Sequence, residues 1–213
     1  MPVVVDTFVL SRTYQSNCYV VRADRGAAEA AVVDPGGDPS SLRLELAGMG
    51  ARTAGILVTH ADVDHVAGVA ELAEGTGAAV WVPAGEAAAL RTGETRTGTR
   101  VAAYEPEHEV RDGDAVTVAG ITFDVVGIRG HSADHVAYCV DGHLFAGDLL
   151  FSGSVGRVDL PGGDWDELLD SIRRLVDRYG PDATVYPGHG PPTTLGRELQ
   201  SNPFLRELRA AAQ

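Results

Sequence analysis

A dense group of imidazole and carboxylate side chains stands in the segment Thr59-His60-Ala61-Asp62-Val63-Asp64-His65. Three later segments add further His and Asp residues: Gly130-His131-Ser132, Phe145-Ala146-Gly147-Asp148 and Tyr186-Pro187-Gly188-His189-Gly190. Imidazole and carboxylate groups are donors that divalent zinc, iron and manganese accept in proteins. The sequence therefore predicts a metal centre assembled from distant parts of the chain.

Each of these segments follows a short β-rich run. Ile56-Leu57-Val58 is typical of a buried strand, and residues from Val66 to Glu74 predict a helix that ends near Gly75. Loops at strand ends, held by a rigid sheet, are places where side chains from distant segments can be brought together. We therefore expect the candidate ligands to lie on strand-end loops.

Further strand-like runs fall into two sets with helices between them. They are Val3–Leu10, Tyr19–Arg22, Ala31–Asp34, Ile56–Thr59, Ala79–Val82, and then Ala115–Val118, Ile121–Ile128, Val136–Val140, Leu144–Ala146 and Thr184–Tyr186. Residues 91–109, rich in Thr, Gly and charge, predict a long loop. The two halves share one layout, in which several strands precede a helix.

Two helices carry clear start signals. Asp38 suits an N-cap with Pro39 in the first helical position, and this helix would end between residues 48 and 50. Asp164 and Glu167 have capping-box spacing at the start of a second amphipathic helix. Helices packed outside two facing sheets would bury the apolar stripes of both.

The order of these segments resembles the metallo-β-lactamase fold superfamily, whose usual first motif is His-x-His-x-Asp-His. Within it, the chain is most similar to single-domain glyoxalase II-like hydrolases, from about residue 8 to about residue 205. The matching stretches are Gln15-Ser16-Asn17-Cys18, Val33-Asp34-Pro35-Gly36-Gly37-Asp38, Gly156-Arg157-Val158-Asp159, Pro187-Gly188-His189-Gly190-Pro191 with Thr193-Thr194, and Asn202-Pro203-Phe204-Leu205. The resemblance implies an α/β (α+β) fold, an αββα sandwich, formed by one domain over residues 1–213.

The resemblance also implies that seven side chains hold two divalent metal ions, with zinc the expected metal. One ion would be held by His60, Asp62 and His131, and the other by Asp64, His65 and His189, with Asp148 bridging them. A carboxylate suits the bridge because it has two oxygens. A bound water whose pKa falls from about 15.7 towards about 7 would attack the substrate, so no protein nucleophile is needed. Asp64 and Asp148 are the residues to which we assign catalytic roles.

Asp62 departs from the family pattern, which usually has His at this position. Asp62 is either a ligand or a nearby non-ligand, since its side chain is shorter than that of His. As a ligand it would cancel the last positive charge of a site in which two divalent ions already face Asp64, Asp148 and a hydroxide. Oxygen donors also favour iron or manganese over zinc. We therefore expect weaker zinc binding at the first position, and Asp62→His should increase it.

Two further residues have open roles. Arg157 follows Asp148 in a Gly-rich loop and would bind a substrate carboxylate through its guanidinium fork. The alternative is a structural pairing of Arg157 with Asp159 or Asp148. His135 lies four residues after His131 and is either a partner of a metal ligand or a solvated loop residue.

Composition limits the function classes. The chain has 213 residues, 44% of them hydrophobic, which is enough for a sizeable core. Its net charge of −13 argues against a nucleic-acid surface. No apolar run predicts a membrane span or a signal peptide, so we expect a cytoplasmic protein and no β-lactamase role. Cys18 and Cys139 lie in strand-like runs and are expected to be buried, inert thiols.

The favoured function is hydrolysis of acyl thioesters by a glyoxalase II-like enzyme. The alternatives are a non-haem iron dioxygenase acting on persulfides, which would use a single iron, and a non-catalytic metal-binding protein of the same fold. The thiol of the substrate stays open between glutathione, mycothiol and coenzyme A, and so does the oligomeric state.

Overall fold

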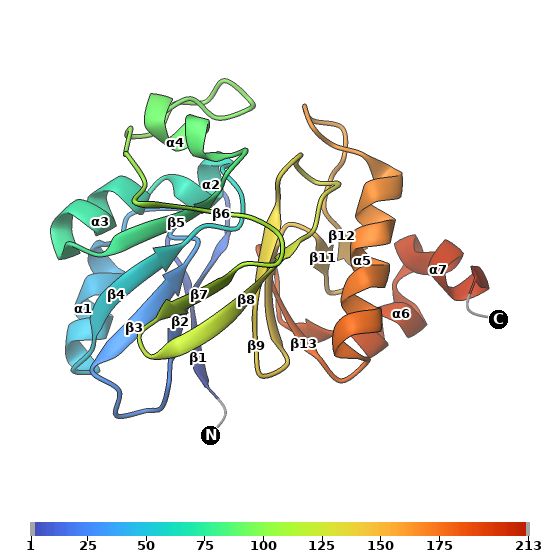
Figure 1. The fold of residues 1–213 in the computed structure, drawn as a ribbon, viewed down its shortest axis with the longest axis horizontal. Coiled ribbons are helices and arrows are strands. Elements are labelled where there is room, and N and C mark those ends of the chain that lie inside the picture. Colours follow the sequence, from blue (N-terminus) through green and yellow to red (C-terminus); the bar gives the residue numbers. More distant parts are fainter. Residues whose placement is uncertain (1–2, 212–213) are drawn as a thin grey trace.

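The computed structural model describes residues 3–211 and shows two six-stranded sheets packed face to face, with helices on the outer side of each (Figure 1). The predicted αββα sandwich is therefore confirmed. Strands of the first sheet lie in chain order: β1 (Val4–Val9), β2 (Asn17–Arg22), β3 (Glu29–Val33), β4 (Arg52–Leu57), β5 (Ala79–Pro83) and β6 (His108–Val110).

The second sheet has the order β14-β13-β10-β9-β8-β7. Its strands are β7 (Ala115–Val118), β8 (Ile121–Gly127), β9 (Val136–Val140), β10 (His143–Gly147), β13 (Thr184–Pro187) and β14 (Thr193–Thr194). A small hairpin of β11 (Leu150–Phe151) and β12 (Ser154–Val155) lies outside both sheets. All the predicted strands are present, whereas β6, β11, β12 and β14 are too short to show a two-residue periodicity.

Helices flank the sandwich on both sides. They are α1 (Ser40–Gly48), α2 (Val63–Val66), α3 (Val69–Thr76) and α4 (Ala87–Thr92) on the first half, and α5 (Trp165–Tyr179), α6 (Leu195–Ser201), the 3-10 turn η1 (Pro203–Leu205) and α7 (Arg206–Ala211) on the second. In the described residues no helix is both long enough and apolar enough to cross a membrane.

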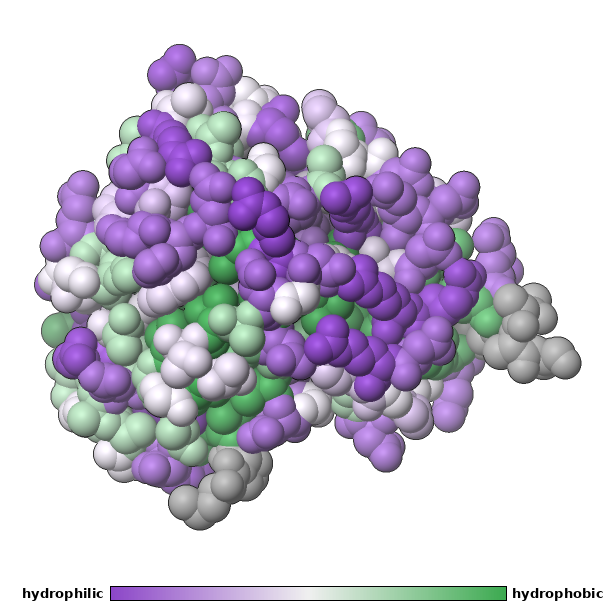
Figure 2. Space-filling view, viewed as in Figure 1, coloured by the Kyte–Doolittle hydropathy of each residue, from purple (hydrophilic) through white to green (hydrophobic). Residues whose placement is uncertain are grey.

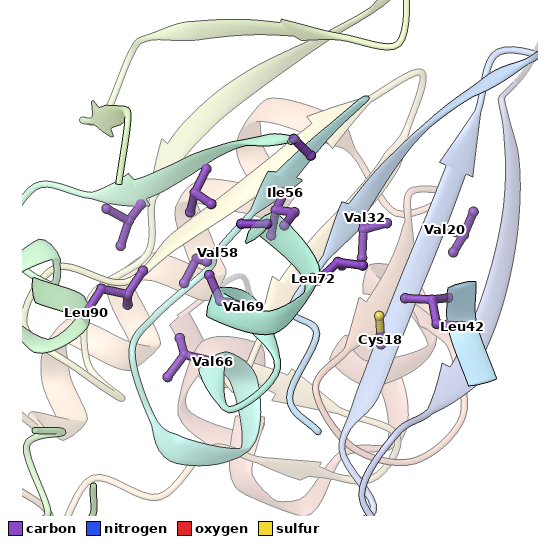
Figure 3. Close-up of a cluster of buried hydrophobic side chains, with 14 of the residues drawn as sticks. Cys18, Val20, Val32, Leu42, Ile56, Val58, Val66, Val69, Leu72 and Leu90 are labelled. Carbon is purple, nitrogen blue, oxygen red and sulfur yellow. The ribbon is translucent and has the colours of Figure 1, made fainter. Parts of the chain in front are cut away.

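Three apolar clusters hold the layers together. The first packs α1, α3 and α4 on the outer face of the first sheet, around Leu42, Ile56 and Leu72 (Figure 3). The second packs α5 and the C-terminal helices on the other sheet, and the third fills the space between the sheets. Because β2 is covered on both faces, all six of its residues are buried. In the view of Figure 2, hydrophilic residues cover α5 and also the region of α4.

The predicted helix from Val66 to Glu74 is wrong as a single element. The structure divides it into α2 and α3, whereas its end is as predicted, because α3 ends at Thr76, next to Gly75, with Gly77 in the left-handed conformation. The two helices meet at Gly68, which packs so closely on the loop after β3 that an added Cβ would lie 2.1 Å from the carbonyl oxygen of Gly37. The amide of Gly68 donates to Pro35 O, so this turn is docked on the loop after β3.

The capping predictions have different outcomes. Asp164 caps α5 by accepting from the amide of Glu167, so this start is confirmed. Pro39 is itself the N-cap of α1, one position later than predicted, and Asp38 instead accepts from the amide of Ser40 just outside the helix. The loop predicted over 91–109 runs from the end of α4 to the start of β6. Cys18 and Cys139 are buried free thiols, as expected.

Candidate metal centre

Loops at the same end of the two sheets bring all seven predicted ligands together. Three groups of donor atoms, each with members within 4.8 Å of one another, contain every one of them: His60 with Asp62 and His131, Asp64 with His65 and His189, and His60 with His65 and Asp148. The first two groups correspond to the two predicted metal positions. Their role as ligands stays a prediction.

At the first position, Asp62 Oδ2 lies 3.2 Å from His131 Nε2 and 3.7 Å from His60 Nε2. Asp62 begins α2 as its N-cap residue, and its extended backbone turns the carboxylate towards the other sheet. The shorter side chain of Asp62 therefore reaches the cluster in place of His.

At the second position, Asp64 Oδ2 lies 3.1 Å from His189 Nε2 and 3.9 Å from His65 Nε2. Asp148 stands between the two groups. Its Oδ1 is 3.3 Å from His65 Nε2, and its Oδ2 is 3.5 Å from His189 Nε2 and 3.9 Å from His131 Nε2. The carboxylate predicted to bridge thus faces both groups.

A buried network anchored on Asp34 fixes the orientation of two imidazoles. Asp34 Oδ2 accepts from His65 Nδ1 at 2.9 Å and from the hydroxyl of Thr59 at 2.6 Å. Since the Thr59 hydroxyl proton goes to Asp34, its oxygen accepts from His60 Nδ1 at 3.0 Å. His131 Nδ1 donates to the carbonyl of Arg157 at 2.8 Å. In each of the three imidazoles Nδ1 is occupied, so Nε2 is the atom offered to the cluster.

The donor atoms fit a metal centre because several are buried and unsatisfied by protein. His60 Nε2, His65 Nε2 and Asp148 Oδ1 form no hydrogen bond of standard geometry among the described residues, although the last two atoms lie 3.3 Å apart. Buried polar atoms are normally paired, so three convergent exceptions call for a ligand. Imidazole nitrogens and carboxylate oxygens suit zinc, iron or manganese. The residues present therefore fit two divalent ions.

Electrostatics within the cluster follow from burial and close opposite charges. Burial lowers the pKa of His60, which favours the neutral ligand form. Burial would raise the pKa of Asp148, but His65 and His189 outweigh it, and the pKa is well below its usual range. Hydrogen bonds to Asp148 and Asp64 raise the pKa of His189 to about 9. The Asp148 carboxylate therefore stays ionised and attracts cations to the site.

The N-terminal segment that carries part of the family resemblance holds two ligand loops in place. Ser16 Oγ donates to the carbonyl of Asp64 at 2.7 Å. Asn17 Nδ2 donates to Pro187 O at 2.9 Å and to Gly190 O at 2.8 Å, on either side of His189. Asn17 is buried, and so is its bond to Pro187 O, whereas the bond to Gly190 O is partly buried. This segment therefore positions one ligand of each chain half.

Two glycines allow the close packing of these loops. A Cβ on Gly188 would lie 2.0 Å from Asp148 Oδ1, inside the space of the carboxylate. A Cβ on Gly36 would lie 1.4 Å from the carbonyl oxygen of Asp64. Only glycine fits at either place.

His135 is neither solvated nor bonded to a ligand through hydrogen bonds. It is fully buried, its ring centroid lies 4.6 Å from that of His60, and neither of its nitrogens has a hydrogen-bond partner in the described part of the chain. Burial lowers the pKa of His135, so the ring is neutral. It therefore packs behind His60 as an uncharged ring.

Asp62 has a partner that the sequence did not indicate. Arg96, from the loop after α4, forms a bidentate pair with Asp62: Nε to Oδ1 and Nη2 to Oδ2, both at 2.6 Å. Burial would raise the pKa of Asp62, but Arg96 and His131 outweigh it and lower it. The Asp62 carboxylate is therefore ionised and already neutralised by a cation of the chain.

A cavity of about 250 Å³ opens over the cluster. Its wall includes Tyr14, Thr97 and Leu160 besides the ligand side chains. Arg157 also lines it, but its guanidinium is exposed and holds Asp159 through two hydrogen bonds of 2.7 Å. The structural pairing that the sequence left open is therefore present, and a role for Arg157 in substrate binding stays a prediction.

Three functional residues were missed from the sequence. Asp34 belonged to a matching stretch, and Thr59 preceded the first ligand, so their positions were known without their roles. Arg96 lay in the predicted long loop, and no spacing rule connects it to Asp62.

Comparison with known proteins gives consistent matches. The family model described as Metallo-beta-lactamase superfamily matches residues 11–189. Hydroxyacylglutathione hydrolase GloC of Haemophilus influenzae is 30% identical over 200 residues, covering 90% of this chain and 93% of that protein. The structure is similar to BLEG-1 B3 metallo-beta-lactamase, with a TM-score of 0.87 and 33% identity over 95% of this chain and 100% of that one. The crystal structure of TTHA1623 in a di-iron-bound form gives a TM-score of 0.76 and 36% sequence identity, covering 94% of this chain and 100% of that one.

Proposed function

The chain belongs to the metallo-beta-lactamase superfamily, and from this premise we propose that it is a metal-dependent hydrolase that cleaves acyl thioesters. The observation that carries the proposal is the convergence of the unpaired atoms His60 Nε2, His65 Nε2 and Asp148 Oδ1 beside further carboxylates of the described chain. Similarity to a hydroxyacylglutathione hydrolase supports the thioester as substrate class.

The residues that would hold the metals are those that the structure brings together. His60, Asp62 and His131 face one position, Asp64, His65 and His189 the other, and Asp148 both. When bound, two divalent ions supply a water whose pKa falls from about 15.7 towards about 7, and positive charge that polarises the scissile carbonyl. We propose zinc as the metal. Iron and manganese are the alternatives, because the oxygen donor of Asp62 suits these harder ions.

The chain itself contributes orientation and a binding surface. Asp34 and Thr59 hold the Nε2 atoms of His60 and His65 towards the cluster. The acyl group would enter the cavity beside Tyr14 and Leu160. A thiol of ordinary pKa leaves as a thiolate without prior protonation, so the protein need not provide a general acid.

We further propose that Arg157 binds a carboxylate of the substrate at the cavity wall. Its pairing with Asp159 is exposed, and exposed ion pairs contribute little to stability because water screens them. A substrate carboxylate can therefore replace Asp159 at modest cost. This would favour thioesters with an acidic group remote from the reacting carbonyl.

The experiment combines metal analysis of the purified protein with assays on a panel of acyl thioesters of glutathione, mycothiol and coenzyme A. A nitrocefin assay covers the β-lactam chemistry named for BLEG-1, and oxygen consumption with a glutathione persulfide covers the dioxygenase alternative. We expect two metal equivalents, thioester hydrolysis and no oxygen uptake. Absence of hydrolysis across the panel in metal-loaded protein would refute the proposal.

Asp148→Ala provides the internal test, because this carboxylate faces both groups. The variant should lose at least one metal equivalent together with hydrolysis while remaining folded. Thr117→Ala is a suitable control, since Thr117 is exposed on β7 and its hydroxyl bonds to that of Thr122, also an exposed side chain. Full activity of Asp148→Ala, or of metal-depleted wild type, would exclude the two-metal site as the catalytic centre.

A further inference from the structure

Arg96 contacts two of the three donors of the first metal position. Besides the bidentate pair with Asp62, its Nη2 lies 2.9 Å from His131 Nε2. Its Nη1 donates to the carbonyls of His131 at 2.7 Å and Pro161 at 3.1 Å. The side chain is largely enclosed, with 12% of its surface exposed. These hydrogen bonds therefore hold Arg96 in one orientation.

His131 Nε2 lies 2.9 Å from Arg96 Nη2 and 3.2 Å from Asp62 Oδ2, and the protons on the ring decide which contact is a hydrogen bond. His131 Nδ1 faces the carbonyl of Arg157 at 2.8 Å and must donate to it. In the neutral ring Nε2 then carries a single lone pair, and an arginine nitrogen can only donate. Arg96 Nη2 therefore donates to the lone pair that a metal ion would use.

The second position has no such competitor. Among the side chains of residues 3–208, no arginine nitrogen forms a hydrogen bond or ion pair with Asp64, His65 or His189. Each position has one Nε2 without a hydrogen-bond partner in the described chain, His60 in the first and His65 in the second, and the difference between the positions is the Arg96 contact with His131 Nε2. The two metal positions therefore differ in accessibility, although their donor counts are equal.

The turn that carries Arg96 is well defined. The amide of Thr95 donates to Thr99 O at 3.0 Å, and that of Gly98 to Thr95 O at 2.9 Å. Thr95 is buried, so the turn is anchored under the loop. Arg96 thus reaches the cluster from a formed structure on the first half of the chain, across to His131 on the second.

We propose that Arg96 and a metal ion compete for His131 Nε2, so that the first metal position binds cations more weakly than the second and fills only when Arg96 releases the imidazole. The inference rests on the proposed metal-dependent function. Asp62 keeps enough lone pairs to hold both Arg96 and a cation, because a carboxylate has about four acceptor sites. His131 is therefore the donor that cannot bind Arg96 and a metal ion at the same time.

The test is a zinc titration of chelator-stripped protein against a competing indicator, which gives two stepwise dissociation constants without any substrate. In wild type the second zinc equivalent should bind about ten- to hundredfold more weakly than the first, because the free energy of a charge-assisted hydrogen bond corresponds to about this ratio of dissociation constants. Arg96→Gln should remove most of this difference. Arg91→Gln is the matched control, because Arg91 pairs with Glu105 and Glu109 at the exposed base of the same loop.

Arg96→Lys separates competition for the lone pair from simple charge repulsion. An ammonium keeps the charge but cannot hold Asp62, both carbonyls and Nε2 together, so this variant should also tighten the weaker position. If Arg96→Lys matches wild type while Arg96→Gln binds more tightly, charge alone is responsible and the proposal is wrong. Equal constants in wild type, or no change in Arg96→Gln, would also overturn it.

Thermal melting shows whether each variant is folded. If Arg96→Gln is not folded, the zinc constants of Arg96→Lys test the competition for His131 Nε2. Failure of this proposal is distinguishable from failure of the proposed function. Two unequal zinc constants that converge in the Arg96 variants would support the competition even if no thioester were hydrolysed. Hydrolysis by a protein with two equal constants would support the function and refute the competition.

Discussion

Replacing Asp34 by Asn should weaken metal binding at both positions, although the side chain is nearly isosteric. The Asp34 carboxylate accepts three hydrogen bonds: from the amide of Thr59 at 2.8 Å, from the Thr59 hydroxyl at 2.6 Å and from His65 Nδ1 at 2.9 Å. An Asn side chain has one acceptor oxygen and one NH2 donor. In one orientation the Asn NH2 group faces the amide of Thr59, which is also a donor. In the other it faces His65 Nδ1, which can accept only if its proton moves to Nε2.

The direction of the effect follows from the tautomer of His65. When the introduced amide turns its NH2 group towards this ring, Nδ1 must become an acceptor, and the proton moves to Nε2, the atom offered to the metal. The Thr59 hydroxyl loses the same acceptor oxygen, so it no longer fixes His60. Loss of such an outer partner typically costs about 10–100-fold in metal affinity.

The same change affects folding stability. Asp34 is 3% exposed, so a donor left without a partner at this position is not rescued by bulk water. A buried unsatisfied donor costs about 1–3 kcal/mol. We therefore expect Asp34→Asn to lower the stability of the stripped protein by about this amount, and to lose part of the stabilisation that bound metal provides.

The measurement is zinc affinity by chelator competition, together with imidazole nitrogen shifts, which report which ring nitrogen carries the proton. Asp38→Asn is the matched control in the same loop, because Asp38 is exposed and accepts from the amide of Ser40 outside the cluster. Unchanged zinc affinity in Asp34→Asn, with His65 still protonated at Nδ1, would show that the network does not set the ligand form and refute the reasoning.

Three further predictions concern the substrate, the unusual ligand and the His189 loop. Arg157→Ala should raise KM for thioesters with a remote carboxylate and leave kcat nearly unchanged; equal losses with carboxylate-free thioesters would indicate a structural arginine. The pairing of Asp62 with Arg96 reverses the expectation from the sequence that Asp62→His alone improves zinc binding, because Arg96 would lose its counterion. Adding Arg96→Gln to Asp62→His should improve zinc binding, and a gain in the single variant would contradict the pairing argument. Asn17→Ala should lower the free energy of unfolding by about 1–3 kcal/mol and weaken zinc at the His189 position, which denaturant titration and chelator competition would show; unchanged values would remove Asn17 from the site.

Much of the fold could be predicted because its signals are local. Apolar runs buried on both faces, such as Ile56-Leu57-Val58, mark central strands, and the Asp164 cap is a contact over three residues. The break between α2 and α3 was not predictable in this way. The break coincides with a hydrogen bond from the amide of Gly68 to Pro35 O, a contact between loops that are distant in sequence, and nothing in the helical pattern around Gly68 reveals it.

In the candidate site too, some residues could be predicted from the sequence and others could not. The resemblance to the metallo-β-lactamase superfamily, carried by imidazole and carboxylate residues in a fixed order, indicated the seven candidate donors that the structure brings together, because a metal centre restricts residue types strongly. The residues that orient these donors are less restricted. Thr59 acts through a hydroxyl between His60 and Asp34, and many residue pairs satisfy such a hydrogen bond. Their function became visible only through distances.

Arg96 changes the argument about the charge of the site. Counting ligands alone, Asp62 cancels the last positive charge of a centre with two divalent ions, Asp64, Asp148 and a hydroxide. The guanidinium, with nitrogens 2.6 Å from both Asp62 oxygens, restores it. The pair of Asp62 and Arg96 is neutral, as a His at this position would be, so charge gives no reason for weaker polarisation of bound water. Two reasons for weaker zinc binding at the first position remain. The oxygen donor of Asp62 favours harder ions, and the guanidinium of Arg96 contacts His131 Nε2, the atom that would bind the metal. Any weakness of the first position should therefore respond to Arg96 more than to Asp62.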